Sequence, residues 1–429
     1  MKPKQTHHAQ GRLFDQRLSH QLNPKHELIQ LSKEINWKAI EAIADVYFEE
    51  TGRKGSPTRL VIGILMLQQI SGLSDEMAVS RWVENPYWQF FCGYDFLQWE
   101  FPIDPSTLVR WRRRIGKEGL EKIFAETIQT AKRTQTVKPA SLKQVIADTT
   151  VMEKNICYPT DGKLYHKMRE KLVQKAKTHD IELRQSYTRK SKKALFQAGR
   201  YFHARQMRRG KKQVKKIKTW LGRVVRDIQR KIENNREHKF YFQTILELAK
   251  RLLAQEKTSP NKIYSLHAPE VECIAKGKAG KKYEFGCKTS LVVTYKEGLA
   301  LNVEALHGNP FDGHTLGRTL EKAEELTGHK IKRTFVDKGY RGHEVKDKEV
   351  IISGQKKGTT AWLKKMMRRR QAIEPHIGHM KSEGKLNRNY LKGKLGDQMN
   401  ALLVGIGHNL RLILATLRRA KEEMSLLTG

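Results

Sequence analysis

The stretch Gln144-Val145-Ile146-Ala147-Asp148-Thr149-Thr150-Val151 decides the fold class. Its apolar and β-branched residues predict a strand, and Asp148 stands where the apolar part of that strand ends. The stretch Lys332–Asp337, which reads Lys-Arg-Thr-Phe-Val-Asp, predicts a second strand that also ends in an aspartate. The ends of strands in an open α/β sheet gather at one edge, where sites form. Two adjacent parallel strands would therefore bring Asp148 and Asp337 together.

Further periodic stretches surround these two strands. The strand patterns are Tyr283–Tyr295, Ala300–Leu306 and Glu349–Ile352, and the helical patterns are His314–Leu326 and Thr360 to about Asn387. Strands that alternate with helices predict an α/β domain, which we place at residues 136–415. Residues 416–429 are expected to form a C-terminal tail.

The charge of the chain indicates a polyanionic partner. Its 429 residues include 83 Lys and Arg against 45 Asp and Glu, which gives a formal net charge of +38. An imbalance of this size is typical of proteins that bind nucleic acid. A surface that serves solubility is the alternative, although acidic charge would serve solubility at least as well.

A basic segment interrupts the α/β domain. Asp161–Lys257 has helical patterns throughout and holds 29 Lys and Arg against 9 Asp and Glu, so we predict a helical insertion at about 161–257. The cations expected to contact DNA phosphates lie in its densest run: Arg208, Arg209, Lys211, Lys212, Lys215 and Lys216. Aromatic side chains between them suit either base stacking or the core of a helical hairpin.

The N-terminal third is predicted to be helical. Residues 1–35 are polar and His-rich, which suggests a flexible arm, and residues 36–135 suggest a helical DNA-binding domain. Pro105 opens a helix with four arginines in five residues. At 100° per residue three of them share a face and are expected to contact DNA, whereas Arg112 points elsewhere; the three are Arg110, Arg113 and Arg114. The region resembles a helix-turn-helix reader, and a helical cap with solvated arginines is the alternative.

Several classes of protein are not expected. The N-terminus lacks an apolar signal-peptide region, and the apolar run Ala401–Leu417 is interrupted by His408 and Arg411, so we expect neither secretion nor a membrane span. The four cysteines have no CxxC spacing, which argues against a zinc site and favours a reduced cytoplasmic protein. No Walker A motif or nucleotide-binding GxGxxG occurs.

Three carboxylates are the candidates for chemistry. Asp148 and Asp337 end strands, and Glu374 lies on the later helix between Arg370 and Lys381. Carboxylates that converge repel one another unless a cation lies between them, and Mg²⁺ prefers such oxygen ligands. Two ions roughly 3.5–4 Å apart would serve an in-line displacement. The alternatives are turn or cap roles for the aspartates and a solvated helical ion pair for Glu374.

Several motifs together carry a resemblance to a known family. They are Asp148–Val151 with Asn155–Asp161, Val336–Gly342, Arg370–Lys381, and the shorter stretches His307–His314 and Gly396–Ala401. With these motifs the chain resembles a DDE transposase of a bacterial insertion sequence, of the insertion-sequence-five type, from about Trp37 to Leu414.

The resemblance implies an RNase H-like catalytic core with a large helical insertion. It implies Asp148, Asp337 and Glu374 as catalytic residues that bind Mg²⁺ or Mn²⁺, with Arg370 and Lys381 beside them. Related families have a Tyr three residues before this Arg, where the present chain has Met367. The implied activity is cleavage of double-stranded DNA at the terminal inverted repeats of a mobile element and joining of the 3′-hydroxyls to target DNA. A homodimer on DNA, associated with the bacterial nucleoid, is expected.

Two other functions are compatible with these sequence features. An RNase H-like nuclease or resolvase would share the three carboxylates but would cut without joining. A non-catalytic DNA-binding protein would keep the basic surface without needing the carboxylates.

Overall fold

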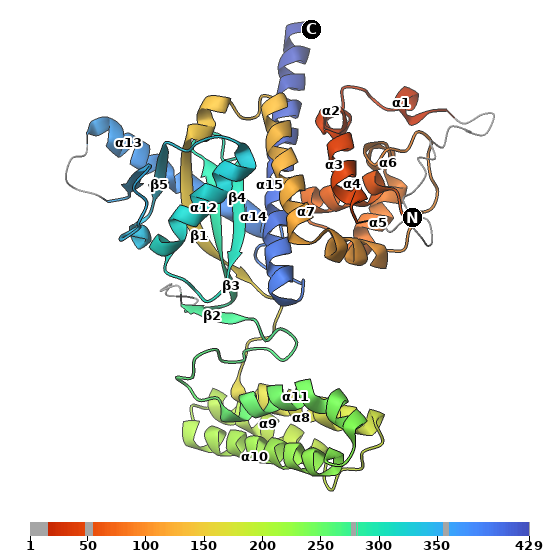
Figure 1. Cartoon of the computed structure of the whole chain (residues 1–429), viewed down its shortest axis with the longest axis vertical. Helices are drawn as coiled ribbons and strands as arrows, with labels where there is room; N and C mark the ends of the chain where they lie inside the picture. The colour runs from red at the N-terminus through yellow and green to blue at the C-terminus, as the bar shows by residue number, and fades with distance from the viewer. Residues whose placement is uncertain (1–15, 48–54, 276–279, 281, 355–359, 429) are drawn as a thin grey trace. The chain divides into compact units, whose positions relative to one another are not determined.

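The structure is a computed structural model that describes residues 16–47, 55–275, 280, 282–354 and 360–428. The chain divides into two compact units, which Figure 1 shows. One, the sheet unit, comprises Met1–Glu153 and Cys287–Gly429, and the other, the helical unit, comprises Lys154–Gly286. Each unit has its own hydrophobic core. In the sequence the helical unit directly follows β1, and it includes β2 and the first four residues of β3.

The sheet contains six strands and is mixed. They are β1 (Gln144–Glu153), β2 (Glu272–Ala275), β3 (Tyr283–Thr294), β4 (Ala300–Leu306), β5 (Arg333–Val336) and β6 (Glu349–Ile352). The strand order is β2-β3-β1-β5-β6, and β4 also pairs with β3. β1 is parallel to β5, β5 is parallel to β6, and β3 is antiparallel to both β2 and β4. Five of these strands were predicted from period-2 patterns, whereas the four-residue β2 was too short to predict.

The register of β1 and β5 fixes the relation between the two predicted aspartates. Ile146 pairs with Phe335, which lies 189 residues later. Asp337 likewise follows Asp148 by 189 residues, so the same register sets these two residues opposite each other. Both residues therefore lie where β5 ends. β1 itself continues to Glu153, so the prediction that Asp148 ends its strand is wrong, because Val151 and Met152 continue the buried pattern of β1 beyond it.

The N-terminal helices share one core with the sheet. They are α1 (Leu18–Gln21), α2 (Glu27–Glu34), α3 (Trp37–Asp45), α4 (Thr58–Ser71), α5 (Asp75–Glu84), α6 (Pro86–Phe91) and α7 (Ser106–Arg133), and a 3₁₀ turn at Pro139–Lys143 leads into β1. The predicted arm at 1–35 is wrong for its described part, since α1 and α2 bury Leu18, Ile29 and Leu31. Residues 1–15 of that arm lie outside the described residues.

The C-terminal helix joins the two halves of the sheet unit. α15 (Gly393–Thr428) packs against α4, α7 and β4, so the predicted tail at 416–429 is instead the end of a long helix. Its stretch Gly393–Glu423 is long and apolar enough to cross a membrane by length and composition, and 72% of its most apolar window is buried within the fold. Packing in the core therefore accounts for its apolar residues.

Two further helical segments flank the sheet. α12 (Asp312–Thr327) packs against β4. α13 (Ala361–Arg369), a 3₁₀ turn and α14 (Ile373–Ser382) follow β6. The single helix predicted from Thr360 to about Asn387 is instead divided into α13, the 3₁₀ turn and α14, which ends at Ser382, where the Glu383 amide donates to the His379 carbonyl.

Most of the helical unit is made up of four helices with their own core. They are α8 (Asp161–Thr178), α9 (Thr188–His203), α10 (Met207–Ile232) and α11 (Arg236–Ala254). Thr160 caps α8 by accepting a hydrogen bond from the Lys163 amide. The core includes Leu172, Leu221 and Phe242. Among the aromatic residues of this unit, Phe242 belongs to the core, as one of the two alternatives expected, whereas Phe240 is 77% exposed.

Candidate active site and DNA-binding surfaces

Asp148 lies on β1 and is held by two contacts. Its Oδ1 accepts a hydrogen bond from the Thr149 amide at 2.7 Å, and its Oδ2 lies 3.3 Å from Arg370 Nη1. Both side chains of this ion pair are largely buried. The structure therefore brings Arg370, on the helical segment after β6, to the first predicted aspartate.

Asp337 directly follows β5 and caps the 3₁₀ turn Lys338–Tyr340. Its Oδ1 accepts a hydrogen bond from the Gly339 amide at 2.8 Å. The cap role that a strand-terminal aspartate often has is thus present here, and Asp337 is also opposite Asp148 in register. Both observations place its carboxylate at the same edge of the sheet.

Asp312 is a third aspartate at this edge, and the sequence reading missed it. Its Oδ1 accepts hydrogen bonds from Thr149 Oγ1 and from Lys288 Nζ, each at 3.0 Å. A Cβ added to Gly339 would stand 3.0 Å from Asp337 Oδ1 and 3.2 Å from Asp312 Oδ2, so both carboxylates adjoin Gly339. Asp312 opens α12 rather than ending a strand, and only its place in the motif His307–His314 could have drawn attention to it.

The side chain of Tyr340 lies near all three aspartates. The side chain is 1% exposed, and its hydroxyl has no hydrogen-bond partner among the described residues. Burial raises the pKa of the Tyr340 phenol well above its ordinary value, and three nearby carboxylates raise it further. These carboxylates belong to Asp148, Asp312 and Asp337. The phenol therefore stays protonated and is a hydrogen-bond donor buried among acidic groups.

Glu374 and Lys381 lie on α14, after Arg370. The backbone is helical from Arg369 onward, so Glu374 follows Arg370 by about one turn. Glu374 is exposed and forms no hydrogen bond or ion pair with another described residue, and Lys381 is in the last turn of α14. Because α14 packs against β1, Glu374 is on the helix next to the strand that carries Asp148.

The four arginines near the start of α7 divide into one buried and three exposed side chains. Arg112 is 6% exposed and forms a bidentate ion pair with Asp75. Burial acts to raise the pKa of Asp75, but the hydrogen bonds and charge of Arg112 outweigh it, and the pKa is lowered. Arg112 is thus structural, whereas the predicted DNA contacts Arg110, Arg113 and Arg114 are exposed.

A groove of about 1330 Å³ in the sheet unit lies beside these arginines. Arg113 lines it together with Arg388, Tyr390 and Lys392, which follow α14. Tyr390 is 58% exposed. These three residues were missed because they lie in a polar stretch with no helical or strand period to draw attention to them.

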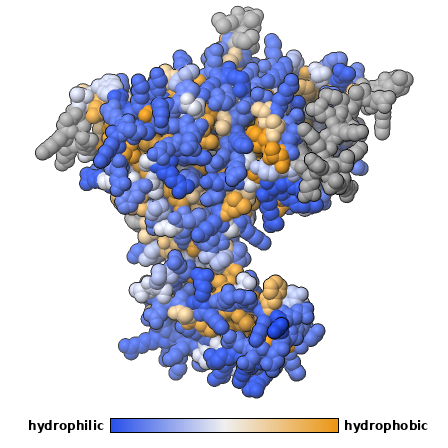
Figure 2. Space-filling view, in the orientation of Figure 1, coloured by the Kyte–Doolittle hydropathy of each residue, from blue (hydrophilic) through white to orange (hydrophobic). Residues whose placement is uncertain are grey.

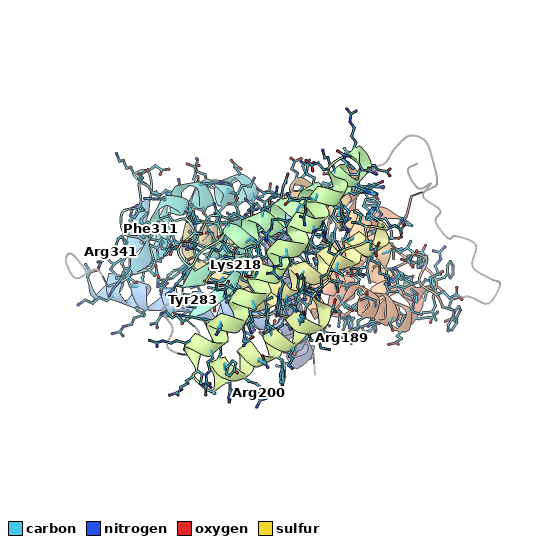
Figure 3. The ribbon with its side chains drawn as sticks, turned by 90° about the horizontal axis from the view of Figure 1, so that it is seen from below. Arg189, Arg200, Lys218, Tyr283, Phe311 and Arg341 are labelled. Atoms are coloured by element: carbon cyan, nitrogen blue, oxygen red, sulfur yellow. The ribbon has the colours of Figure 1, made fainter. Side chains whose placement is uncertain are left out.

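The helical unit presents a long basic surface. All six cations predicted to contact phosphates on α10 are exposed, and none forms an ion pair with another described residue. Figure 3 shows Arg189 and Arg200 on α9 and Lys218 on α10, which add to this surface. On the face in Figure 2, hydrophilic side chains cover most of the helical unit, with small apolar areas between them.

A second basic feature of the helical unit is a groove of about 950 Å³ between α10 and α11. Its lining residues include Arg223, Arg226, Arg230, Lys239, Phe240 and Lys250. Phosphate-binding cations next to an exposed aromatic ring are the combination used by surfaces that bind nucleic acid strands. The sequence reading placed DNA contacts in the first half of α10 and missed this groove.

Comparisons with known proteins agree with the geometry. Residues 16–114 match the family described as "Transposase domain (DUF772)", and residues 332–414 match "Transposase DDE domain". A stretch of 206 residues, 48% of the chain, is 46% identical to the entire "Uncharacterized protein ORF8 in nfe locus" of Rhizobium meliloti. No solved structure matches the chain. The second matched domain contains Asp337, Arg370, Glu374 and Lys381. The chain therefore belongs to a DDE transposase family.

Proposed function

We propose that this protein cuts DNA at the ends of a mobile element of the insertion-sequence-five type and joins the 3′-hydroxyls to target DNA. The observation that carries the proposal is the register of β1 and β5, which, continued two residues past the pair Ile146–Phe335, sets Asp148 within β1 opposite Asp337 at the end of β5. The helix with Arg370 and Glu374 packs against the same β1. The mixed sheet and the matched DDE domain support an RNase H-like core for this site.

The donors at this edge of the sheet suit hard divalent cations. We propose that Asp148, Asp337 and Glu374 bind Mg²⁺ or Mn²⁺, because carboxylate oxygens are the ligands these ions prefer. Asp312 stands beside the two aspartates and adds a further oxygen donor. When bound, such ions would activate the attacking oxygen and neutralise charge on the phosphate.

The side chains around the carboxylates position the phosphate. Arg370 and Lys381 bring positive charge to the helix that carries Glu374, and we propose that they hold the non-bridging phosphate oxygens. The protonated phenol of Tyr340 adds a buried donor. Both reactions are in-line phosphoryl transfers, which depend on positioning and charge neutralisation rather than on a covalent enzyme intermediate.

The exposed cations would hold the DNA. We propose that Arg110, Arg113 and Arg114 contact the terminal repeats and that the basic surface of α10 contacts the backbone of double-stranded DNA. A homodimer on DNA would pair the two ends of the element, and a cytoplasmic location at the nucleoid would follow. Phosphate contacts position a protein but carry little sequence information.

The test compares charge-neutral variants of the carboxylates on DNA that carries the repeats of the element. Asp148→Asn, Asp337→Asn and Glu374→Gln should each abolish metal-dependent cleavage and strand transfer while DNA binding is retained. Glu321→Gln is the matched control, since Glu321 is exposed on α12 away from these contacts. Cleavage without joined products from the wild type would favour a nuclease or resolvase. Binding without any cleavage would favour a non-catalytic DNA-binding protein.

A further inference from the structure

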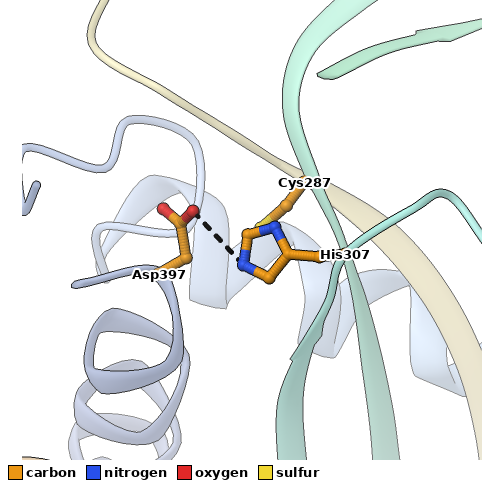
Figure 4. Close-up of side chains that lie close together, drawn as sticks. All are labelled: Cys287, His307 and Asp397. Atoms are coloured by element: carbon orange, nitrogen blue, oxygen red, sulfur yellow. Dashed lines mark ion pairs between the residues drawn. The ribbon is translucent and has the colours of Figure 1, made fainter. Parts of the chain in front are cut away.

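Three potential metal ligands meet in the sheet unit, outside the carboxylate site. Cys287 is on β3, His307 directly follows β4, and Asp397 is near the start of α15. One ligand atom from each residue lies within 4.8 Å of the other two. Figure 4 shows the three side chains side by side. Their spacing in the sequence follows no known motif, so the fold alone brings them together.

The distance between two of these atoms suits an ion between them. His307 Nε2 and Asp397 Oδ2 are 3.6 Å apart. An N–H···O hydrogen bond would be roughly 2.7–3.2 Å long. Two ligands that each stand about 2.0–2.1 Å from one tetrahedral ion are roughly 3.4 Å apart. The observed distance is therefore closer to the edge of a coordination tetrahedron than to a hydrogen bond.

Two of the three side chains are buried, and a hydrogen bond orients Asp397. Cys287 is 1% exposed and Asp397 is 3% exposed. Asn389 Nδ2 donates a hydrogen bond to Asp397 Oδ1 at 2.6 Å, which turns Oδ2 toward His307. The backbone amide of Asn389 in turn donates a hydrogen bond to the backbone carbonyl of Glu153 at the end of β1. Outer hydrogen bonds of this kind orient the ligands of protein metal sites.

We propose that Cys287 Sγ, His307 Nε2 and Asp397 Oδ2 bind a divalent transition-metal ion, with Zn²⁺ as the best fit. Thiolate and imidazole ligands favour Zn²⁺ over Mg²⁺, which prefers the all-oxygen donors of the carboxylate site. A thiolate and a carboxylate neutralise the two charges of the ion, so the buried site carries no net charge. Three protein ligands leave one tetrahedral position for a solvent molecule.

The position of this site gives the ion a structural role. Cys287 immediately precedes Lys288, which binds Asp312. His307 begins the short segment that leads to Asp312 at the start of α12. An ion between Cys287 and His307 would therefore fix both chain segments that position the Lys288–Asp312 pair.

The experiment titrates the full-length protein, stripped of metal with a chelator, with Co²⁺ and records its absorption spectrum. A thiolate ligand gives a sulfur-to-cobalt charge-transfer band in the near ultraviolet, which an all-oxygen site cannot give. We expect this band to saturate at one equivalent and to disappear when Zn²⁺ is added. Cys287→Ser should remove the band, whereas Cys157→Ser and Cys273→Ser should keep it, since neither cysteine belongs to the cluster.

A wild-type protein without the band, or a Cys287→Ser variant that keeps it, would overturn the proposal. If circular dichroism shows that Cys287→Ser does not fold, X-ray absorption by the zinc-loaded wild type decides instead. One sulfur ligand per zinc ion supports the site, and only nitrogen and oxygen ligands overturn it. Neither readout depends on DNA cleavage, so the result is independent of the function proposed above.

Discussion

Arg370 and Asp148 are 222 residues apart in the sequence and lie 3.3 Å apart in the fold. The pair joins the helical segment that carries Glu374 to the strand that carries the first aspartate. It is largely buried, so its charges are only partly screened by water. The same contact thus joins this helical segment to β1 and holds a guanidinium beside the Asp148 carboxylate.

Replacing Arg370 should reduce DNA cleavage more than it reduces DNA binding. We expect Arg370→Ala to lower the cleavage rate by about 10²–10³-fold, as for other preorganised groups that stabilise developing charge. Arg370→Lys should recover only part of this loss, because it restores the charge but not the planar donor pair. Single-turnover cleavage measures both, and Arg368→Ala, which removes an exposed arginine nearby, is the control. Equal losses in the two alanine variants would contradict the assigned role.

The Lys288–Asp312 pair should contribute to stability as a coupled unit. Lys288→Met alone leaves the Asp312 carboxylate next to Asp337 without its cation, so we expect a loss of about 1–3 kcal/mol in the free energy of unfolding. Asp312→Asn alone should also destabilise the protein, and the double variant should lose less than the sum of the two. Urea unfolding of all four proteins gives the coupling energy. The more exposed pair Arg333–Glu349 serves as comparison, with an expected coupling of about 0.2–1 kcal/mol.

Replacing the buried arginine of α7 should lower the stability of the protein, whereas replacing the three exposed arginines should weaken its binding to DNA. Arg112→Leu leaves the largely buried Asp75 carboxylate with a hydrogen bond from Gln68 but without its cation, which should cost about 3 kcal/mol of stability, at the lower end for a buried pair. Joint replacement of Arg110, Arg113 and Arg114 by Ala should leave the melting temperature nearly unchanged and weaken binding to the terminal repeats. Thermal unfolding and a binding titration on one preparation test both statements. Unchanged discrimination between repeat and random DNA in the triple variant would transfer recognition to the helical unit.

If the basic surface of α10 contacts DNA phosphates, it should increase the salt dependence of the affinity for DNA. Each phosphate contact contributes about 0.9 to the log–log slope of affinity against salt on duplex DNA. Replacing Lys211, Lys212, Lys215 and Lys216 by Ala should therefore flatten the slope and weaken binding to repeat and random DNA by similar factors. The control with the same change in net charge replaces four exposed lysines of the sheet unit: Lys33, Lys38, Lys122 and Lys143. A slope equal to that of the wild type would mean that α10 only faces solvent.

His408 should make the fold sensitive to acid. The side chain is buried in α15 and its Nε2 donates to the Gly298 carbonyl at 2.9 Å. Burial lowers the pKa of His408 to about 3, and the charges of His376, Arg411 and His379 add to this, while the hydrogen bond to Gly298 acts against it. A histidine with a lowered pKa stabilises the fold fully above the unfolded value of about 6.5, and this contribution is lost as the pH falls toward 3.

This loss amounts to roughly 1.4 kcal/mol per pH unit between those limits. His408→Gln keeps a donor for Gly298 and should flatten the pH dependence of the free energy of unfolding between pH 4 and 6. Replacing the exposed His203 by Gln should leave that dependence unchanged. A wild-type curve that is already flat over this range would contradict the prediction.

The sequence predicted five of the six strands, because period-2 patterns indicate burial on a sheet. It placed the end of β5 correctly, directly before Asp337, but it placed the end of β1 at Asp148, whereas β1 continues to Glu153. It did not predict Asp312, since the contact of this residue with Thr149 depends on how α12 returns to the sheet edge. The sequence also did not predict the buried ion pair between Arg112 and Asp75. The position of Arg112 on its helix gives the direction of the side chain but does not show which residue of another helix lies opposite it. The predicted boundary at residue 36 failed for the same reason, as α2 packs against α15, which begins far later in the chain.

The entry and exit of the helical unit meet at one backbone hydrogen bond, in which the Lys154 amide donates to the Phe285 carbonyl at 2.9 Å. A segment whose two ends are already adjacent can be gained, exchanged or lost in a single genetic event, because the neighbouring strands need not move to close the gap. Its four helices also have a core of their own. The basic surface on this segment is thus free to change at a different evolutionary pace from the carboxylates of the sheet, and mobile elements with the same chemistry could differ in how they hold their DNA.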